Sequence, residues 1–413
     1  MTEEQDVVPL LEPREGIPPV VADADGLRAT VAAFAAGAGP VAVDAERASG
    51  YRYGGRAYLV QLRREGSGTA LIDPIACPDL SALDAALADA EIVLHAASQD
   101  LPCLAELGFR PRRIFDTELA GRLLGYERVG LGTMVETVLG LRLEKGHSAV
   151  DWSTRPLPED WLRYAALDVE VLVELRDALH AELEASGKLE WALEEFDAVL
   201  HAPPPEPRND PWRRTSGIHK VRSPRALAVV RELWTMRDRI AREGDLAPGR
   251  VLPDGAIIAA ALEAPRTRKA LTEITAFTAR TARRHIGEWL AAVTRARSLP
   301  DSELPAPSVP GDGPPPANRW ADRDPAAARR LAAARAVVAA LADEHRMPTE
   351  NLLQPDAVRR LTWQPPADVT DETVAARLRE LGAREWQIRL TAHPLAKAMM
   401  RLETKGEVGR PVP

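Results

Sequence analysis

Cysteine is scarce in this chain of 413 residues. Only Cys77 and Cys103 are present, and neither lies in a C-x-x-C pair or in a cluster with histidine. This scarcity excludes a disulfide framework, and it makes a structural zinc site an unexpected feature.

Long apolar runs are absent as well. No uncharged stretch approaches the roughly 18 residues that a membrane-spanning helix needs. The first residues are acidic and proline-bearing, whereas a secretory signal is basic and then apolar. We therefore expect a cytoplasmic protein in a reducing compartment, without a membrane partner.

Three catalytic signatures are missing from the sequence. It has no G-x-S-x-G nucleophile elbow, no phosphate-binding P-loop, and no G-x-G-x-x-G motif before a helix. Chemistry that depends on a covalent nucleophile is therefore not evident. What the chain does have is material for several cores, because 45% of its residues are hydrophobic and its length predicts two to four domains.

Charge is unevenly distributed along the chain. The formal net charge is −8, but residues 212–297 contain 18 Lys and Arg against 8 Asp and Glu. This segment therefore carries +10, which leaves −18 for the remainder. Such segregation fits a basic module that binds a polyanion, and it equally fits an Arg-rich helical surface facing solvent.

The pattern up to about residue 200 predicts a mixed sheet with helices on both faces. Residues 1–20 read as a loose tail. Apolar runs joined by short turns favour antiparallel strands, and an intervening helix makes the next pairing a parallel crossover. The expected strands are 41–46, 57–62, 70–73, 91–95 and 113–116, and the expected helices are 25–36, 81–88, 100–107, several over 117–141, and 161–183 after Pro158.

Two proline-rich breaks divide the rest of the chain, at residues 203–207 and 299–318. The segments that follow them are helical and self-similar, since Glu243 to Ile257 resembles Glu344 to Val358. We read a tandem repeat of a small helical domain of roughly 85 residues. The expected division is 1–211 for the α/β domain with its tail and linker, 212–298 and 319–405 for the helical domains, and 299–318 for the second linker.

One stretch organises the chain chemically, the run Val41-Ala-Val-Asp44-Ala-Glu46. Residues i and i+2 of a strand share a face, so the two carboxylates lie side by side. Two such charges repel each other and lose hydration, and a divalent cation relieves both effects. Taken alone, a pair of surface acids is the commoner explanation.

Further acidic residues strengthen the metal interpretation. Asp100 follows a buried strand at a strand–helix turn, although N-capping would explain it too. Tyr164 and Asp168 lie four apart on one helix face, although a packed tyrosine beside a solvated aspartate is an alternative. Four carboxylates without Cys or His suit Mg²⁺ or Mn²⁺. Two such ions about 4 Å apart stabilise the attacking and leaving oxygens in phosphodiester hydrolysis.

Residues 18–200 resemble the ribonuclease D family, tyrosine-bearing 3′–5′ exonucleases with four site carboxylates (DEDD) and an RNase H-like fold. The basic segment resembles the HRDC domain (helicase and RNase D C-terminal), a helical nucleic-acid-binding module, and the last domain resembles a second, diverged copy. The resemblance rests on Val-Ala-Val-Asp44-Ala-Glu46 with Leu-Val-Gln61-Leu, on Leu94-His95 with Asp100, and on Asp151-Trp-Ser before Tyr164-x₃-Asp168.

The resemblance implies a role for each site residue. Asp44 would bridge two divalent ions, with Glu46 and Asp168 completing one and Asp100 holding the other. Tyr164 would orient the attacking water, because an unperturbed phenol is a poor base.

Gln61 and His95 are expected to hold the 3′-terminal nucleotide or the metal shell, and His95 is equally well explained as a core histidine. The chain departs from the family at Arg47, where an apolar residue is common, and in the Gly- and Arg-rich stretch 49–55.

These observations predict a 3′–5′ exoribonuclease that acts on RNA, with precursor tRNA ends as the substrate that the resemblance favours and a monomer as the expected state. A 3′–5′ DNA exonuclease of the same fold is one alternative. A non-catalytic RNA-binding scaffold is another, but it would have no reason to keep four clustered acids.

Overall fold

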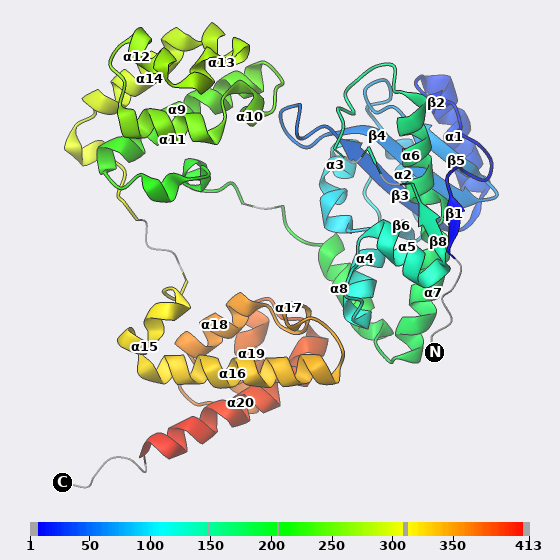
Figure 1. Cartoon of the computed structure of the whole chain (residues 1–413). Helices are drawn as coiled ribbons and strands as arrows, with labels where there is room; N and C mark the ends of the chain where they lie inside the picture. The colour runs from blue at the N-terminus through cyan, green and yellow to red at the C-terminus, as the bar shows by residue number, and fades with distance from the viewer. Residues whose placement is uncertain (1–6, 145, 148, 205, 309–312, 408–413) are drawn as a thin grey trace.

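Strand β3 (Ala38–Arg47) lies inside a six-stranded sheet of the first domain. Its residues Val41, Ala42 and Val43 are fully buried, as expected for a β-branched run that packs on both faces. The computed structural model describes residues 7–407 except 145, 148, 205 and 309–312 (Figure 1). The strand order is β2-β5-β4-β3-β6-β7, with bounds β2 Val20–Val21, β4 Ala57–Glu65, β5 Gly68–Ile72, β6 Ile92–Leu94 and β7 Ile114–Asp116.

The sheet is mixed, as the sequence predicts. Strand β3 runs antiparallel to β4, and β4 runs antiparallel to β5, across short connections. On its other edge β3 pairs in parallel with β6, and β6 pairs in parallel with β7, after helical crossovers. The register sets Asp44 opposite Gln61 and Glu46 opposite Leu59.

Helices cover both faces of the sheet. On the face that carries Asp44 and Glu46, helix α6 packs through Ala165 and Ala166 on Leu59 and Leu71. The opposite face joins the main core with α1 and α2. The helices of this domain are α1 Ala24–Ala36, α2 Ser81–Ala86, α3 Leu101–Glu106, α4 Thr117–Leu124, α5 Leu131–Leu139, α6 Glu159–Glu170, α7 Leu172–Ala185 and α8 Leu189–Leu200.

The structure differs from the sequence reading at three places. The expected loose tail contains β1 (Val8–Leu10), which pairs in parallel with β8 (Leu141–Leu143), and it ends in β2, which pairs with β5. The expected single helix over 161–183 is two helices, because Val171 leaves helical geometry at φ −115° and ψ 7°. Helix α8 has no counterpart in the sequence reading.

Two helical domains follow. A 20-residue helix, a one-turn helix and a helix of 10 or 9 residues follow one another in the same order in both domains, which supports the self-similarity seen in the sequence. No described helix is long and apolar enough to cross a bilayer. The first has α9 Pro224–Glu243, α10 Pro248–Val251, α11 Asp254–Glu263, α12 Arg268–Glu273, α13 Arg280–Arg284 and α14 Ile286–Ser298; the second has α15 Trp320–Arg323, α16 Pro325–Glu344, α17 Thr349–Leu352, α18 Pro355–Trp363, α19 Asp371–Glu380 and α20 Glu385–Glu407.

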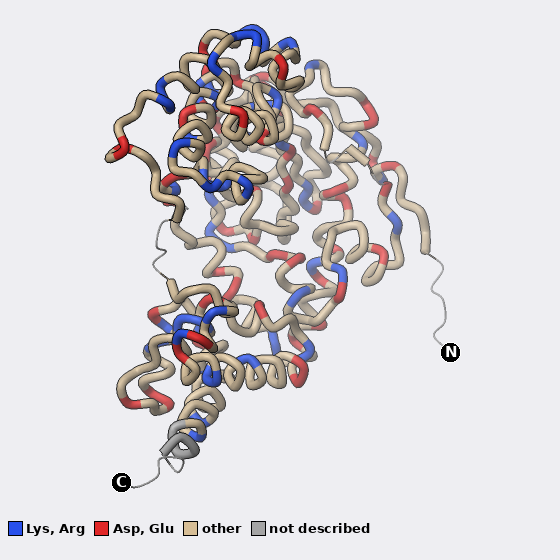
Figure 2. The backbone as a smooth tube through the Cα atoms, turned by 60° about the vertical axis from the view of Figure 1, so that its left-hand side comes forward, with Lys and Arg blue, Asp and Glu red and all other residues tan. Residues whose placement is uncertain are grey.

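The last domain packs against α8. In Figure 2, basic and acidic positions are interspersed along the backbone of this domain. Trp386 stacks on Trp191 with ring centroids 5.0 Å apart, and its Nε1 donates to Glu195. The Lys188 ammonium donates to the carbonyl oxygens of Leu123 and His345, both at 2.6 Å, and so bridges the two domains.

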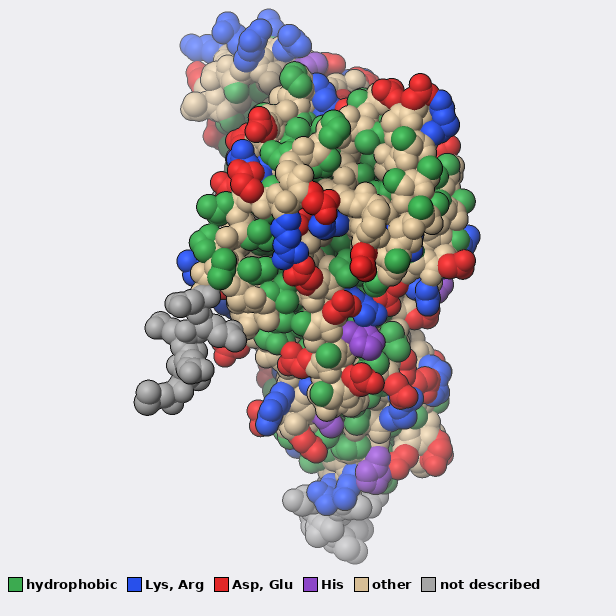
Figure 3. Space-filling view, turned by 90° about the vertical axis from the view of Figure 1, so that its right-hand side faces the viewer, with side chains coloured by type: hydrophobic (Ala, Val, Ile, Leu, Met, Phe, Trp, Pro, Cys, Tyr) green, Lys and Arg blue, Asp and Glu red, His purple; other side chains and the backbone are tan. Residues whose placement is uncertain are grey.

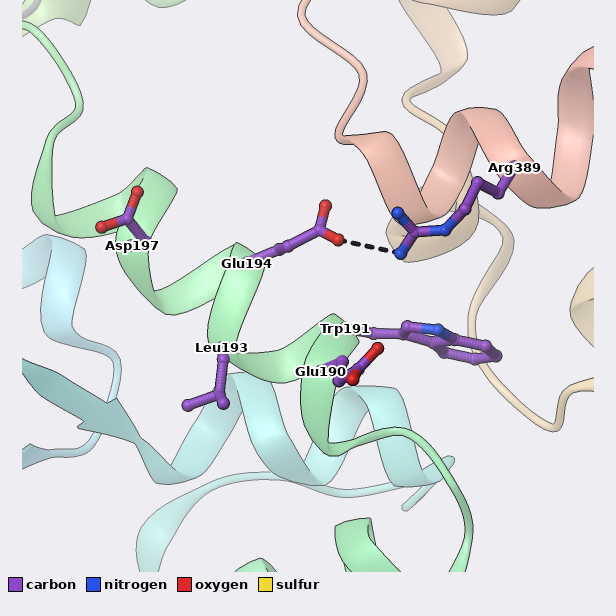
Figure 4. Close-up of a pocket in the computed structure, with 6 residues that line it drawn as sticks. All are labelled: Glu190, Trp191, Leu193, Glu194, Asp197 and Arg389. Atoms are coloured by element: carbon purple, nitrogen blue, oxygen red, sulfur yellow. Dashed lines mark hydrogen bonds and ion pairs between the residues drawn. The ribbon is translucent and has the colours of Figure 1, made fainter.

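A pocket opens at this contact between α8 and α20. Figure 4 shows Arg389 reaching from α20 to Glu194 of α8, an ion pair of 2.9 Å, over the ring of Trp191, while the exposed side chain of Leu193 points away from the pair. The pocket lies among residues that join two domains, and we assign it a structural role.

Candidate active site

Three carboxylates meet on the face of the sheet that α6 covers. Asp44 and Glu46 project from β3 to that face, and Asp168 projects from α6 toward them. One carboxylate oxygen from each lies within 4.8 Å of the others. Asp44 of β3 and Asp168 of α6, which are 124 residues apart in the sequence, thus belong to one acidic cluster.

Asp100 approaches the cluster from the turn after β6. It occupies the N-cap position of α3, yet its side chain makes no capping hydrogen bond. Instead the Asp100 carboxyl shares a hydrogen bond with Asp44 and lies 3.5 Å from Arg47 Nη2. Asp44 therefore contacts Asp100 and also belongs to the cluster with Glu46 and Asp168.

The turn that carries Asp100 is held by Asp116, to which the sequence analysis assigns no role in the site. Asp116 is buried, and its carboxylate accepts from the backbone nitrogens of Ala96 at 3.0 Å and Ala97 at 2.9 Å. These bonds hold Ala96 in the left-handed region at φ 63°. In the sequence, this role is indicated by the position of Asp116, which ends a predicted strand and directly precedes a predicted helix.

Tyr164 lies above the cluster and hydrogen-bonds Asp168. Its ring lies near His147, at 5.9 Å between centroids, and near the fully buried Trp152, at 6.5 Å. The loop with Trp152 is fastened to the sheet by Arg155, which donates to both Asp73 oxygens at 2.7 and 2.8 Å. This loop fixes the position at which α6 begins, and thereby the position of Tyr164 relative to the acidic cluster.

Gln61 lies behind Asp44. It is fully buried, its Nε2 donates to Asp44 Oδ2, and it does not line the cavity above the cluster. Of its two expected roles, this geometry supports the one in the metal shell.

His95 lines the cavity, but its ring is already occupied. Its Nδ1 lies 2.9 Å from Thr117 Oγ1, and it also hydrogen-bonds the backbone of Val129. Burial lowers the pKa of His95 to about 4, so the imidazole is neutral near pH 7. Its role as a substrate contact stays a prediction.

The cavity above the acids has a volume of about 700 Å³ and brings together six of the seven predicted residues, all but Gln61. It also contains residues that sequence reasoning did not assign. Among them, Arg128 is exposed and has no carboxylate partner in the part of the chain that the structure describes. Its sole sequence signal is a position near two glycines, which is too common to interpret.

Electrostatics make this cluster unfavourable without a cation. Burial, with repulsion from Asp44, Asp168 and Asp100, raises the pKa of Glu46 to about 10. Burial and the neighbouring Asp44 raise the pKa of Asp100 to about 8. Burial also raises the pKa values of Asp44 and Asp168, and burial with nearby carboxylates raises that of Tyr164.

These residues fit a divalent metal. Clustered, partly desolvated carboxylates must either take up protons or bind a cation, and an all-oxygen donor set suits hard ions. The elevated pKa of Tyr164 keeps the phenol protonated, so it can donate a hydrogen bond but is a poor base. Four acids and one tyrosine over a mixed sheet are the arrangement expected of an exonuclease of the DEDD class, and they suit divalent metal binding.

Comparison with known proteins agrees with this class. Residues 19–184 match a family model described as 3′-5′ exonuclease, residues 226–293 match the HRDC domain, and residues 313–399 match a 3′ to 5′ exonuclease C-terminal domain. The last match is to a model other than HRDC, although the helix order of the two domains is alike.

Named relatives and solved structures point the same way. The chain is 32% identical to ribonuclease D of Gluconacetobacter diazotrophicus, over 80% of this chain and 82% of that one, and 34% identical to that of Escherichia coli, over 65% and 72%. A Bifidobacterium adolescentis protein of 39% identity superimposes with a TM-score of 0.87, over 95% and 99% of the chains. Escherichia coli RNase D, described as an exoribonuclease involved in structured RNA processing, gives 28% identity and 0.66, over 94% and 98%. The chain belongs to the ribonuclease D family.

Proposed function

We propose that this chain removes nucleotides from RNA 3′ ends by hydrolysis assisted by two divalent ions, Mg²⁺ or Mn²⁺. The observation that carries the proposal is that Asp44 contacts Asp100 and also clusters with Glu46 and Asp168. Such a set can hold two ions through a shared carboxylate. When bound, the ions would stabilise charge on the attacking and leaving oxygens.

The side chains of the protein would orient the attacking water and the metal-binding carboxylates, and would hold protons near them. Tyr164 would orient the attacking water, and its protonated phenol and its hydrogen bond to Asp168 support this role. Gln61 fixes the Asp44 carboxylate from behind. The buried walls contributed by β3 and α6 exclude bulk water, which strengthens each electrostatic contact.

The HRDC domain would hold the RNA. Six exposed cations at and between α12 and α13 have no ion-pair partner among the described residues, and Figure 3 shows basic side chains gathered at this end of the molecule. Binding through them should weaken steeply with salt, because each phosphate contact releases counterions. They are Arg266, Arg268, Lys269, Arg280, Arg283 and Arg284.

The favoured substrate is the 3′ end of a structured RNA such as precursor tRNA, acted on by a monomer in the cytoplasm. The test is a time course on 5′-labelled RNA with a single-stranded 3′ tail, in Mg²⁺, Mn²⁺ or chelator, beside Asp44→Ala. We expect metal-dependent shortening from the 3′ end that the variant lacks. Faster shortening of a matched DNA would favour the DNA alternative, and binding without shortening would favour the scaffold.

A further inference from the structure

A second cavity, of about 390 Å³, adjoins the cavity above the acids. Both are lined by Ala45, Glu46 and Arg47, so the second begins where the first ends. Both volumes lie in the range of roughly 300–1,000 Å³ that is typical of small-ligand pockets. The groove therefore continues past Arg47 toward the loop that follows β3.

The outer rim of the second cavity is built by two domains. Tyr51 lines the cavity, and its hydroxyl donates to the Ala149 carbonyl oxygen at 3.4 Å. The guanidinium of Arg250, from α10 of the HRDC domain, lies 3.9 Å from the Tyr51 ring centroid, and its Nε donates to the Gly50 carbonyl oxygen at 2.8 Å. Figure 1 shows the loop between β3 and β4 reaching toward α10.

A separate set of contacts docks the HRDC domain on the same loop. The Tyr53 hydroxyl donates to Asp238 at 2.9 Å, and Arg56 pairs with Asp245 at 3.0 Å. Neither Tyr53 nor Arg56 lines the second cavity. Arg250 therefore contributes to docking as well as to the rim, whereas Tyr53 and Arg56 contribute to docking alone. A variant of Arg56 thus isolates the effect of docking from that of the rim.

The charge at the rim is not neutralised within the described part of the chain. Arg250 is exposed, and no carboxylate lies within ion-pair distance of it among the described residues. Its Nε bonds the Gly50 carbonyl oxygen, a neutral partner that leaves the positive charge uncompensated. Arg250 contacts Gly50 and Tyr51, which line the second cavity, so this cation lies beside the groove that continues from the acidic cluster.

We propose that the second cavity holds the nucleotide next to the 3′-terminal one, and that Arg250 of the HRDC domain binds a phosphate of the RNA at its outer rim. This inference rests on the proposed function, since it assumes that an RNA 3′ end enters the acidic cluster. It makes the HRDC domain a direct part of the substrate groove. Arg250 of the HRDC domain contacts the stretch 49–55, which departs from the family pattern.

The experiment measures binding of a five-nucleotide RNA to the full chain in chelator, so that no cleavage interferes. Arg250→Ala is compared with Arg250→Lys, which keeps the charge, and with Arg56→Ala, which removes a docking contact outside the groove. Each protein is titrated at several salt concentrations, and also with RNAs that carry one neutral methylphosphonate at successive linkages. Thermal unfolding of each variant checks that the fold is intact.

We expect Arg250→Ala to weaken binding about fivefold, as loss of one exposed charge contact does, and to lower the salt slope by about 0.7. Arg250→Lys should retain most of the affinity. One methylphosphonate position should weaken wild-type binding and have no further effect in Arg250→Ala.

The proposal is overturned if Arg250→Ala binds like wild type. It is also overturned if Arg56→Ala causes the same loss while every methylphosphonate penalty persists in Arg250→Ala, because Arg250 would then act through docking alone. A failure of the proposed function shows itself separately, as wild-type protein that binds RNA and never shortens it with either metal.

Discussion

Nη2 of Arg47 lies 3.5 Å from Oδ1 of Asp100, and Nη1 of the same guanidinium donates to the Gln99 carbonyl oxygen at 2.7 Å. A fixed cation therefore stands beside a predicted metal ligand, at a position where the family commonly has an apolar residue. Because this positive charge opposes a bound metal ion, it should lower the metal affinity of the cluster.

We predict that Arg47→Leu binds Mg²⁺ more tightly, by about fivefold, the equivalent of roughly 1 kcal/mol at this range. Calorimetric titration of the RNA-free protein measures the change. Arg128→Leu is the matched control, since Arg128 lines the same cavity without an ion pair to the acids among the described residues. Weaker Mg²⁺ binding in Arg47→Leu would show instead that orienting Asp100 is the main role of Arg47.

Asp168→Asn should separate activity from stability. Removing one of three carboxylates within 4.8 Å should lower exonuclease activity by about 1,000-fold or more, because the metal loses a ligand. In chelator at pH 8 the same change relieves repulsion, so the unfolding midpoint should rise. Asp160→Asn, on the exposed side of α6, is the control for both measurements. A lower midpoint for Asp168→Asn would contradict the electrostatic account.

The fold class and the clustering of the acids could be predicted from the sequence for a physical reason. Alternation along β3 fixes which face Asp44 and Glu46 share, and the four-residue spacing of Tyr164 and Asp168 fixes their common helix face. These are local geometric rules, so they can be applied without a structure. Asp100 is placed near the acids, but its actual contacts with Asp44 and Arg47 depend on the turn that Asp116 holds.

The sequence could not predict contacts between segments that are far apart in the chain and have weak local patterns. Strand β1 has three residues, and its partner β8 is 131 residues further along the chain, so neither shows a strand pattern strong enough to interpret. The break at Val171 has no Gly or Pro to mark it. The contact between Tyr51 and Arg250 joins residues of two domains, and the position of a docked domain follows from surface complementarity rather than from periodicity.

Metal binding should strengthen with pH. The raised pKa values of Glu46, about 10, and Asp100, about 8, mean that the metal-free folded state binds more protons than the unfolded state above about pH 4.5. Their contribution to stability is therefore present at low pH and is lost as pH rises toward these folded values. Because metal competes with those protons, its stabilising effect should grow over the same interval.

The measurement is the Mn²⁺-induced shift of the unfolding midpoint between about pH 6 and pH 9. We expect the shift to increase with pH in the wild-type chain and to be small throughout in Asp44→Asn. A shift that is constant with pH in wild type would show that the cluster is already ionised at pH 6.

Gly125 ends α4 at φ 89°, and a Cβ built on it would lie 2.2 Å from the Arg346 carbonyl oxygen of the last domain. Gly140 ends α5 in a similar left-handed conformation at φ 67°, with nothing within 4 Å of its Cβ position. The two glycines therefore differ in one respect, the close approach of another domain. Gly140→Ala should cost about 1 kcal/mol of stability from backbone strain alone.

Gly125→Ala should cost more, because the added methyl group pushes Arg346 away and strains the adjacent bond from Lys188 to the His345 carbonyl oxygen. We expect the last domain to separate from α8, which unstacks Trp386 from Trp191. Limited proteolysis should then cut Gly125→Ala between the domains faster than Gly140→Ala, and Trp fluorescence should report the exposed rings. Equal proteolysis of the two variants would mean that the domain contact adjusts to the methyl group, and that stacking of Trp386 on Trp191 governs docking without help from the glycine.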